Sequence, residues 1–330
     1  MSVAERILVV GAGSIGLRHV RNLKRLGVAE ILVHDPSRER LELAENAGAI
    51  PLTGLDEGFA RRPRGVAVCT PPHFHLDVAL RALDAGAHLF VEKPLAASAA
   101  GVDVLIERAA RAGRSVLVGY NLRFHAGVRR VKALVDAGAI GRVLSVKAHF
   151  GQYLPDARPS QNYLDGYLAQ ADSGGLILDA SHEFDCVRWF GGEAERVVAL
   201  ADNVSDLGLP QPDIVLALLR LRTGVVASVH VDCVRRGYSR GGMIIGALGT
   251  IVWELTTGVR VFTVDTGTWR EEAIVPDLNE MYVAEMEHWL ACLRGEATPL
   301  TDGADGLRTL KLALAAGTAA KTGREIEVEV

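Results

Sequence analysis

The sequence lacks the cysteine patterns of disulfide-linked and zinc-binding proteins. Its four cysteines stand far apart and none belongs to a Cys-x-x-Cys pair, so neither a disulfide framework nor a zinc knuckle is indicated. Reduced, mostly buried thiols are typical of cytoplasmic proteins, and this is the location we expect. The four residues are Cys69, Cys186, Cys233 and Cys292.

Excess basic charge and long apolar runs are missing as well. The net charge is −4 with neutral histidines, and no cluster of lysine and arginine predicts a nucleic-acid or membrane partner. No stretch reaches the roughly 18 apolar residues that a membrane-spanning helix needs. No charged segment precedes an apolar one at the N-terminus, so we expect no signal peptide. With 330 residues, 49% of them hydrophobic, the chain is long enough for two domains.

The first 120 residues alternate short apolar runs with amphipathic segments of helical length. Strands are predicted at 7–10, 31–33, 66–69, 88–92 and 116–118, and helices between them, one of them with Pro36 in its first turn. Such alternation predicts a parallel sheet with right-handed crossovers and with helices on both faces.

The pattern changes after Tyr120. We expect a helix at 126–137, a strand at 143–150 and a helix at 175–190, followed by six alternating segments between 195 and 264. Turns such as Arg222-Thr223-Gly224 separate these segments, which predicts an antiparallel sheet. Two amphipathic helices, near 279–294 and 303–321, end the chain.

A glycine-rich turn, Gly11-Ala12-Gly13-Ser14-Ile15-Gly16, follows the first strand and opens the first helix. The first glycine permits the tight turn, the second lets a pyrophosphate approach the backbone, and the third lets the helix pack on the strand. The helix N-terminus then presents unpaired N–H groups to the phosphates. We therefore expect a Rossmann dinucleotide-binding domain over residues 1–122, with cofactor contacts from Gly11, Gly13, Ser14, Ile15 and Gly16.

Asp35 follows the second strand, at the position of the carboxylate that accepts hydrogen bonds from the adenosine ribose. This carboxylate would repel a 2′-phosphate, which favours NAD. Ser37 and Arg38 come directly afterwards and would suit such a phosphate, so NADP remains an alternative.

Glu92-Lys93-Pro94 stands at the carboxyl end of a predicted parallel strand, where ligands bind in open α/β sheets. A lysine there can polarise or protonate an oxygen on the carbon that exchanges hydride, although a solvated lysine is the alternative. The neighbouring strand ends in a stiff loop, Thr70-Pro71-Pro72-His73-Phe74-His75. Its two histidines would need a third partner to ligate a metal, and none follows at a telling spacing, so we expect no metal.

Asp179, His182 and Asp185 are spaced by three within the predicted 175–190 helix, so they should share one face. Histidine suits proton transfer near neutral pH, and a neighbouring aspartate can orient its ring and raise its pKa. Alternatively, His182 packs internally while both aspartates pair with Arg188.

Together these motifs resemble the Gfo/Idh/MocA family of nicotinamide-dependent oxidoreductases, which includes glucose–fructose oxidoreductase and inositol dehydrogenases. The resemblance spans essentially the whole chain and rests on segments 11–16, 69–75, 87–95, 119–125 and 174–185. It implies that Lys93 contacts the reacting hydroxyl, that His182 is the general acid/base with Asp179 in support, and that Asn121 and Arg123 face nicotinamide or substrate. The further cofactor contacts that we expect are Thr70, Pro71, Pro72, His75, Glu92, Lys93 and Asn121.

The resemblance also implies an α/β fold: an N-terminal Rossmann domain and, over 123–330, a substrate-binding α/β domain on an open, mainly antiparallel sheet. Members commonly form homodimers or homotetramers through that sheet. Many members space the aspartate and histidine by four, whereas Asp179 and His182 are three apart. On a continuous helix this displaces Asp179 by about 100°, and Glu183 and Asp185 are then the alternative partners of His182.

The resemblance implies a polyol substrate: a sugar, an amino or nucleotide sugar, or a cyclitol. A polar, aromatic loop before the 175–190 helix suits hydroxyl recognition and stacking on a sugar, unless it only covers a sheet edge or an interface. Its residues are Gln152, Tyr153, Arg158, Gln161, Asn162, Tyr163 and Tyr167. Hydride transfer is the reaction we expect. Transient oxidation with a tightly bound cofactor and a non-catalytic NAD(P)H sensor are the alternatives.

Overall fold

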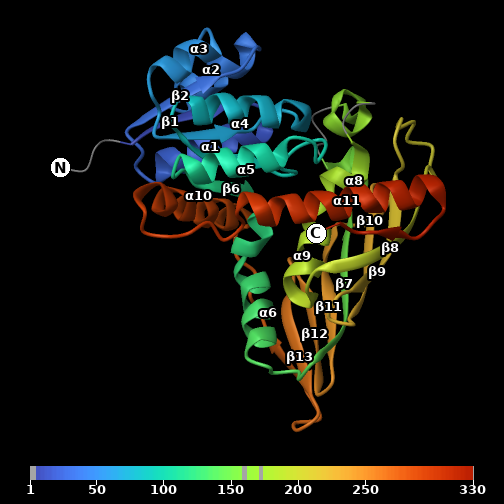
Figure 1. Ribbon diagram of the computed structural model, residues 1–330. Coiled ribbons are helices and arrows are strands. Elements are labelled where there is room, and N and C mark those ends of the chain that lie inside the picture. The colour runs from blue at the N-terminus through green and yellow to red at the C-terminus, as the bar shows by residue number, and fades with distance from the viewer. Residues whose placement is uncertain (1–4, 158–161, 171–173, 330) are drawn as a thin grey trace. The chain divides into compact units, whose positions relative to one another are not determined.

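The computed structural model describes residues 5–157, 162–170 and 174–329 (Figure 1). It divides into two compact units. The first comprises Met1–Asn121 and Leu278–Leu307, and the second comprises Leu122–Asp277 and Arg308–Val330. No helix in the described ranges is long and apolar enough to cross a membrane.

The first unit is built on a sheet of six parallel strands in the order β3-β2-β1-β4-β5-β6. This arrangement is the expected Rossmann sheet. The sequence patterns missed β3, which has only three residues, a proline among them, and a single buried side chain, Leu52. The strands are β1 (Arg6–Val10), β2 (Glu30–His34), β3 (Ile50–Leu52), β4 (Gly65–Val68), β5 (His88–Glu92) and β6 (Val116–Gly119).

Helices cover the sheet, and Figure 1 shows two of them, α4 and α5, side by side. One helix begins later than expected: α2 starts at Arg38 with Ser37 as its N-cap, which leaves Pro36 outside. The helices of this unit are α1 (Ser14–Arg25), α2 (Arg38–Asn46), α3 (Leu55–Ala60), α4 (His75–Asp84), α5 (Val102–Arg111) and α10 (Leu278–Arg294).

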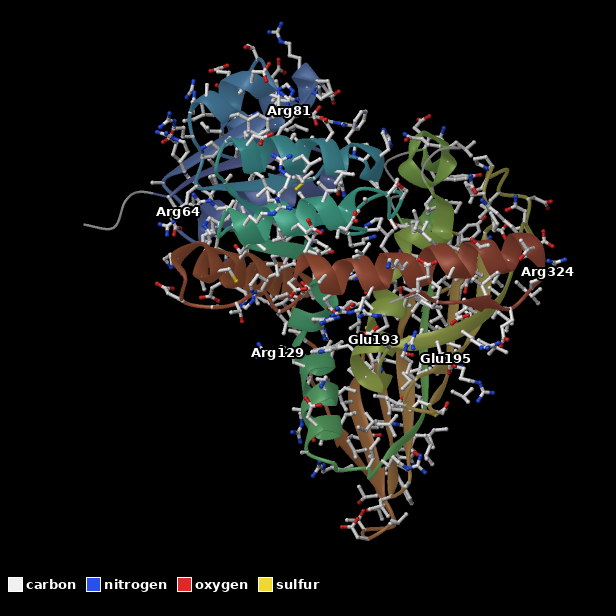
Figure 2. All side chains as sticks on the ribbon, in the orientation of Figure 1. Arg64, Arg81, Arg129, Glu193, Glu195 and Arg324 are labelled. Atoms are coloured by element: carbon white, nitrogen blue, oxygen red, sulfur yellow. The ribbon has the colours of Figure 1, made fainter. Side chains whose placement is uncertain are left out.

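Helix α10 belongs to this first unit although it comes late in the chain, so the division differs from the expected single cut after residue 122. The first crossing, after Asn121, lies beside the expected one. The chain returns because α10 packs against α1 and buries Met286, Trp289 and Leu293 in the core of the unit. Arg64, labelled in Figure 2, donates to the carbonyl of Leu293 at 2.7 Å.

The second unit is built on a sheet of nine strands in the order β14-β13-β12-β11-β7-β10-β9-β8-β15. In the described part of the chain only β7 and β10 of this sheet pair in parallel, so the sheet is mainly antiparallel, as expected. The strands are β7 (Val143–Gly151), β8 (Ala194–Asp202), β9 (Ile214–Leu221), β10 (Val226–Asp232), β11 (Ser239–Gly246), β12 (Gly249–Glu254), β13 (Gly258–Thr263), β14 (Trp269–Glu272) and β15 (Ile326–Glu327).

One face of this sheet is covered, since α9 packs against β7 and β10. Burial alternates along β9, where Val215, Ala217 and Leu219 are buried and Leu216 and Leu218 between them are exposed. The helices are α6 (Ala126–Asp136), α7 (Leu154–Ala157), α8 (Gly175–Asp179) and α9 (Ser181–Gly191), while α11 (Gly303–Thr322) continues from the first unit into the second.

Candidate active site

The glycine turn between β1 and α1 has the geometry that its sequence predicts. Gly11 has a φ of +96°, and a Cβ on it would lie 2.6 Å from the carbonyl oxygen of Cys69. A Cβ on Gly16 would lie 1.9 Å from the carbonyl oxygen of Gly11, so α1 approaches β1 as closely as expected. A Cβ on Gly13 would meet nothing within 4 Å. The space in front of Gly13 is therefore open to a ligand.

The N-terminus of α1 faces that open space. Gly13 is the N-cap and supplies no side-chain hydrogen bond, while Ser14 and Ile15 form the first turn. The first N–H groups of a helix have no partner within it and carry a positive partial charge. These residues therefore fit the pyrophosphate of a dinucleotide.

Asp35 braces this turn from the end of β2. One carboxylate oxygen accepts from the N–H of Ala12 at 2.7 Å and the other accepts from the N–H of Ser37 at 2.8 Å. The side chain is buried, so its position is fixed by these contacts. Each oxygen keeps a lone pair with which it can accept from a ribose hydroxyl.

The arginine beside Asp35 is Arg40, which the sequence reading missed. Its Nη1 lies 3.7 Å from the carboxylate of Asp35. Arg38, the candidate for a 2′-phosphate in the NADP alternative, pairs with Glu42 at 3.0 Å on the exposed side of α2. The side chain of Ser37 caps α2 by accepting a hydrogen bond from the N–H of Arg40, the third residue of the helix. This contact keeps Arg40 near the end of β2, so a serine N-cap in the sequence is the feature that could have identified Arg40.

Lys93 follows β5 directly, and hydrogen bonds hold the backbone on both sides of it. Its N–H donates to Glu92 Oε2 at 3.1 Å, and Glu92 Oε1 lies 2.7 Å from His19 Nε2. On the other side, the carbonyl of Pro94 lies 2.9 Å from His75 Nδ1. The lysine side chain itself is half-buried.

His75 joins the loop after β4 to the loop after β5. Its Nε2 lies 2.7 Å from the carbonyl oxygen of Thr70, while Nδ1 faces Pro94. The ring is buried, and burial lowers the pKa of His75. Since both nitrogens face protein carbonyls, the geometry favours a role in positioning these loops over the direct cofactor contact that we expected.

Two unpartnered polar atoms lie at the carboxyl ends of the parallel strands. Thr70 Oγ1 follows β4 and Asn121 Oδ1 follows β6, and neither has a hydrogen-bond partner within the described ranges. Between them in the loop, Pro71 is exposed and Pro72 is buried in a short 3-10 helix. Buried polar atoms without protein partners fit a ligand that supplies them, as the cofactor would.

The helix expected at 175–190 is in fact two helices, and this prediction was wrong. Asp179 ends α8, Ala180 leaves helical geometry with φ −89° and ψ 25°, and His182 lies in the first turn of α9. The break resets the rotation of the chain. The displacement of Asp179 by about 100° that a continuous helix implies therefore does not apply.

Glu183 and Asp185, the alternatives to Asp179, are each paired with an arginine. Glu183 holds Arg240 through two contacts of 2.7 and 3.1 Å. Asp185 holds Arg123 through two contacts of 2.8 and 2.6 Å. Arg188, the partner that we considered for both aspartates, makes a two-point contact with Glu193, which Figure 2 labels, and its Nη1 also lies 4.0 Å from Asp185 Oδ1.

The predicted substrate residues of the second unit are therefore partly engaged in structural contacts. Besides its pairing with Asp185, Arg123 lies 5.2 Å from the centre of the Trp189 ring. Tyr163 donates to the carbonyl of Leu207 at 3.1 Å. The ring of Tyr153 is covered by Arg236 at 3.4 Å. Arg158, Gln161 and the side chain of Tyr167 lie outside the described part of the chain.

Comparison with known proteins gives one consistent result. Residues 5–120 match the profile of an oxidoreductase family with an NAD-binding Rossmann fold, and residues 128–252 match the GFO/IDH/MocA C-terminal domain. Myo-inositol 2-dehydrogenase of Thermotoga maritima is 27% identical over 98% of both chains. Inositol 2-dehydrogenase 1 of Saccharopolyspora erythraea is 30% identical over 98% of this chain and 96% of the relative.

Solved structures show the same fold. A levoglucosan dehydrogenase in complex with NADH and levoglucosan has a TM-score of 0.87 at 20% identity, over 99% of this chain and 100% of that chain. The WlbA dehydrogenase from Bordetella pertussis in complex with NADH and UDP-GlcNAcA has a TM-score of 0.84 at 24% identity, over 100% and 99% of the two chains. At these identities the likeness establishes the fold alone.

Proposed function

Because the chain belongs to the Gfo/Idh/MocA family of NAD-dependent oxidoreductases, we propose that it transfers a hydride reversibly between nicotinamide and a secondary alcohol of a polyol. The polyol is a sugar, an amino or nucleotide sugar, or a cyclitol. Relatives named inositol dehydrogenases and a neighbour solved with levoglucosan support this class.

The first unit offers the groups that would hold NAD. The open space at Gly13 and the N-terminus of α1 suit the pyrophosphate, and Asp35 suits the adenosine ribose. Thr70 and Asn121 supply polar atoms at the edge of the sheet. The nicotinamide, when bound, supplies the hydride acceptor.

The observation that carries the proposed chemistry is the anchoring of Lys93. Its backbone is held by Glu92 on one side and, through Pro94, by His75 on the other, at the ligand-binding end of β5. During oxidation, an ammonium group there would stabilise the negative charge that develops on the substrate oxygen as its proton leaves.

His182 is our candidate for the base that takes this proton, with Asp179 in support. Imidazole suits the role because its ordinary pKa lies near neutrality. Asp179 is the preferred support because Glu183 and Asp185 are each paired with an arginine. The assignment of both residues rests on the family resemblance and on this elimination.

We further propose a homodimer or homotetramer formed through the exposed face of the nine-stranded sheet. Val198, Leu200, Leu216 and Leu218 are exposed there, and β8 and β9 place Val198 opposite Leu218 and Leu200 opposite Leu216. An apolar patch on a sheet face is a common protein interface.

Four free, buried cysteines are consistent with a cytoplasmic protein.

The proposed function is tested with a panel of sugars, inositols and nucleotide sugars, each offered with NAD and with NADP. Reduced nicotinamide, followed by its absorbance, should accumulate with at least one polyol, and more with NAD. If no polyol is oxidised with either cofactor and no matching ketone is reduced, the proposal fails. If the cofactor copurifies with the protein and never accumulates in reduced form, transient oxidation of the substrate by a tightly bound cofactor replaces net hydride transfer as the proposed reaction.

A further inference from the structure

A carboxyl group lies in the core of the first unit without a hydrogen-bond partner among the described residues. Glu285, on α10, is 0% exposed, and neither of its carboxyl oxygens has a hydrogen-bond partner among the described residues. An ionised carboxylate is very costly to bury without a donor, so such a group normally keeps its proton. Burial without a donor therefore favours the neutral form of Glu285.

Other titratable groups face this site from three elements. Glu92, the last residue of β5, and Cys69, which follows β4, each interact electrostatically with Glu285. His19, on α1, binds Glu92 and lies 6.2 Å, ring to ring, from Tyr282 on α10. Burial raises the pKa of Glu285, and the negative charge of Glu92 raises it further.

The two carboxyl groups differ in what surrounds them. Glu92 accepts from the N–H of Lys93 at 3.1 Å, and its other carboxyl oxygen lies 2.7 Å from His19 Nε2. Gly119 leaves room for the carboxyl group of Glu92, because a Cβ on Gly119 would lie 3.2 Å from Glu92 Oε2. Glu92 therefore has at least one backbone donor, whereas Glu285 has none within the described ranges.

We propose that Glu285 is a positioning residue for Lys93. As a neutral acid buried beside Glu92, it keeps the pair at a single negative charge, and that charge holds the backbone of Lys93. A second negative charge would repel Glu92 from this position and loosen the end of β5. The inference deepens the proposed function, because it rests on the role of Lys93 in hydride transfer.

The proton on Glu285 is tested without substrate by infrared spectroscopy. A buried protonated carboxyl group absorbs above the amide region, and we expect this band in the wild type at neutral pH and its loss in Glu285→Gln. In Glu92→Gln the band should titrate away at lower pH than in the wild type, because the neighbouring charge is gone. A band that survives in Glu285→Gln, or no band in the wild type, overturns the inference.

The effect on Lys93 is tested by the pH dependence of kcat. Ionisation of Glu285 should contribute to the loss of kcat at alkaline pH, and Glu285→Gln should move this loss to higher pH. Where the wild type has fallen to half of its maximum, the variant should retain about twofold more of its own maximum. Met286→Leu, a similar-sized change at the next buried position, should leave the profile in place.

Identical alkaline profiles for the wild type and Glu285→Gln would overturn the positioning role, even if the infrared band is present. The infrared experiment and the kinetic experiment also distinguish a failure of this inference from a failure of the proposed function. A protein that oxidises no polyol refutes the proposed function, whereas the infrared band still decides whether Glu285 holds the proton.

Discussion

Removing the carboxylate of Asp185 should destabilise the second unit strongly. Asp185 and Arg123 form a two-point ion pair of 2.8 and 2.6 Å, and their side chains are only 1% and 5% exposed. Asp185→Ala leaves the guanidinium buried with its main counter-charge gone, and Thr309 loses an acceptor at 3.2 Å. Breaking one side of such a pair costs about 3–5 kcal/mol.

The size of this loss can be measured by urea unfolding. With a slope of about 2 kcal/mol per molar urea, the midpoint should fall by roughly 1.5–2.5 M. Tryptophan fluorescence is a suitable signal, because Trp189 lies against Arg123. Glu325→Ala is the matched control: it breaks an exposed pair with Arg196 and should leave the urea midpoint close to that of the wild type.

A double variant separates the charge effect from simple loss of packing. Arg123→Leu with Asp185→Leu removes both charges and fills the space with apolar atoms, so its cost should be well below the sum of the two single changes. Additive costs, or a loss of less than about 1 kcal/mol in Asp185→Ala, would show that the pair does not stabilise this region as we infer.

Three further predictions concern other parts of the molecule. Burial raises the pKa of Glu285 above its ordinary value of 4.5, so the folded protein should lose stability as the pH rises above that value, by up to about 1.4 kcal/mol per pH unit. Unfolding measured as a function of pH should show that Glu285→Gln removes this slope. Leu216→Lys together with Leu218→Lys should reduce the mass in sedimentation to that of one chain, and an unchanged mass would exclude this sheet face as the interface. His75→Phe removes the two contacts by which this buried ring links the loops, so kcat/KM for NAD should fall by about tenfold, and an unchanged value would refute the positioning role of His75.

Features that depend on neighbouring residues were predicted well from the sequence. The roles of Gly11, Gly13 and Gly16 follow from the backbone of one turn, and the structure gives each the expected surroundings. The parallel sheet follows from the alternation of strands and helices. The break at Ala180 was missed because alanine favours helix and neither glycine nor proline marks the position.

Contacts between residues far apart in the sequence could not be predicted from local sequence patterns. The partners of Glu183 and Asp185 are Arg240 and Arg123, which are 57 and 62 residues away in the sequence. No local pattern links such positions. The burial of Glu285 was equally invisible, because it depends on the return of α10 to the first unit.

The central claim, that Lys93 acts in hydride transfer, is tested most directly by Lys93→Met. With a polyol that the wild type oxidises, we expect kcat to fall by at least about 10²-fold, while NADH binding, followed by fluorescence, stays close to that of the wild type. Lys147→Met, at an exposed lysine on β7, should retain wild-type turnover. Full activity in Lys93→Met would contradict the account.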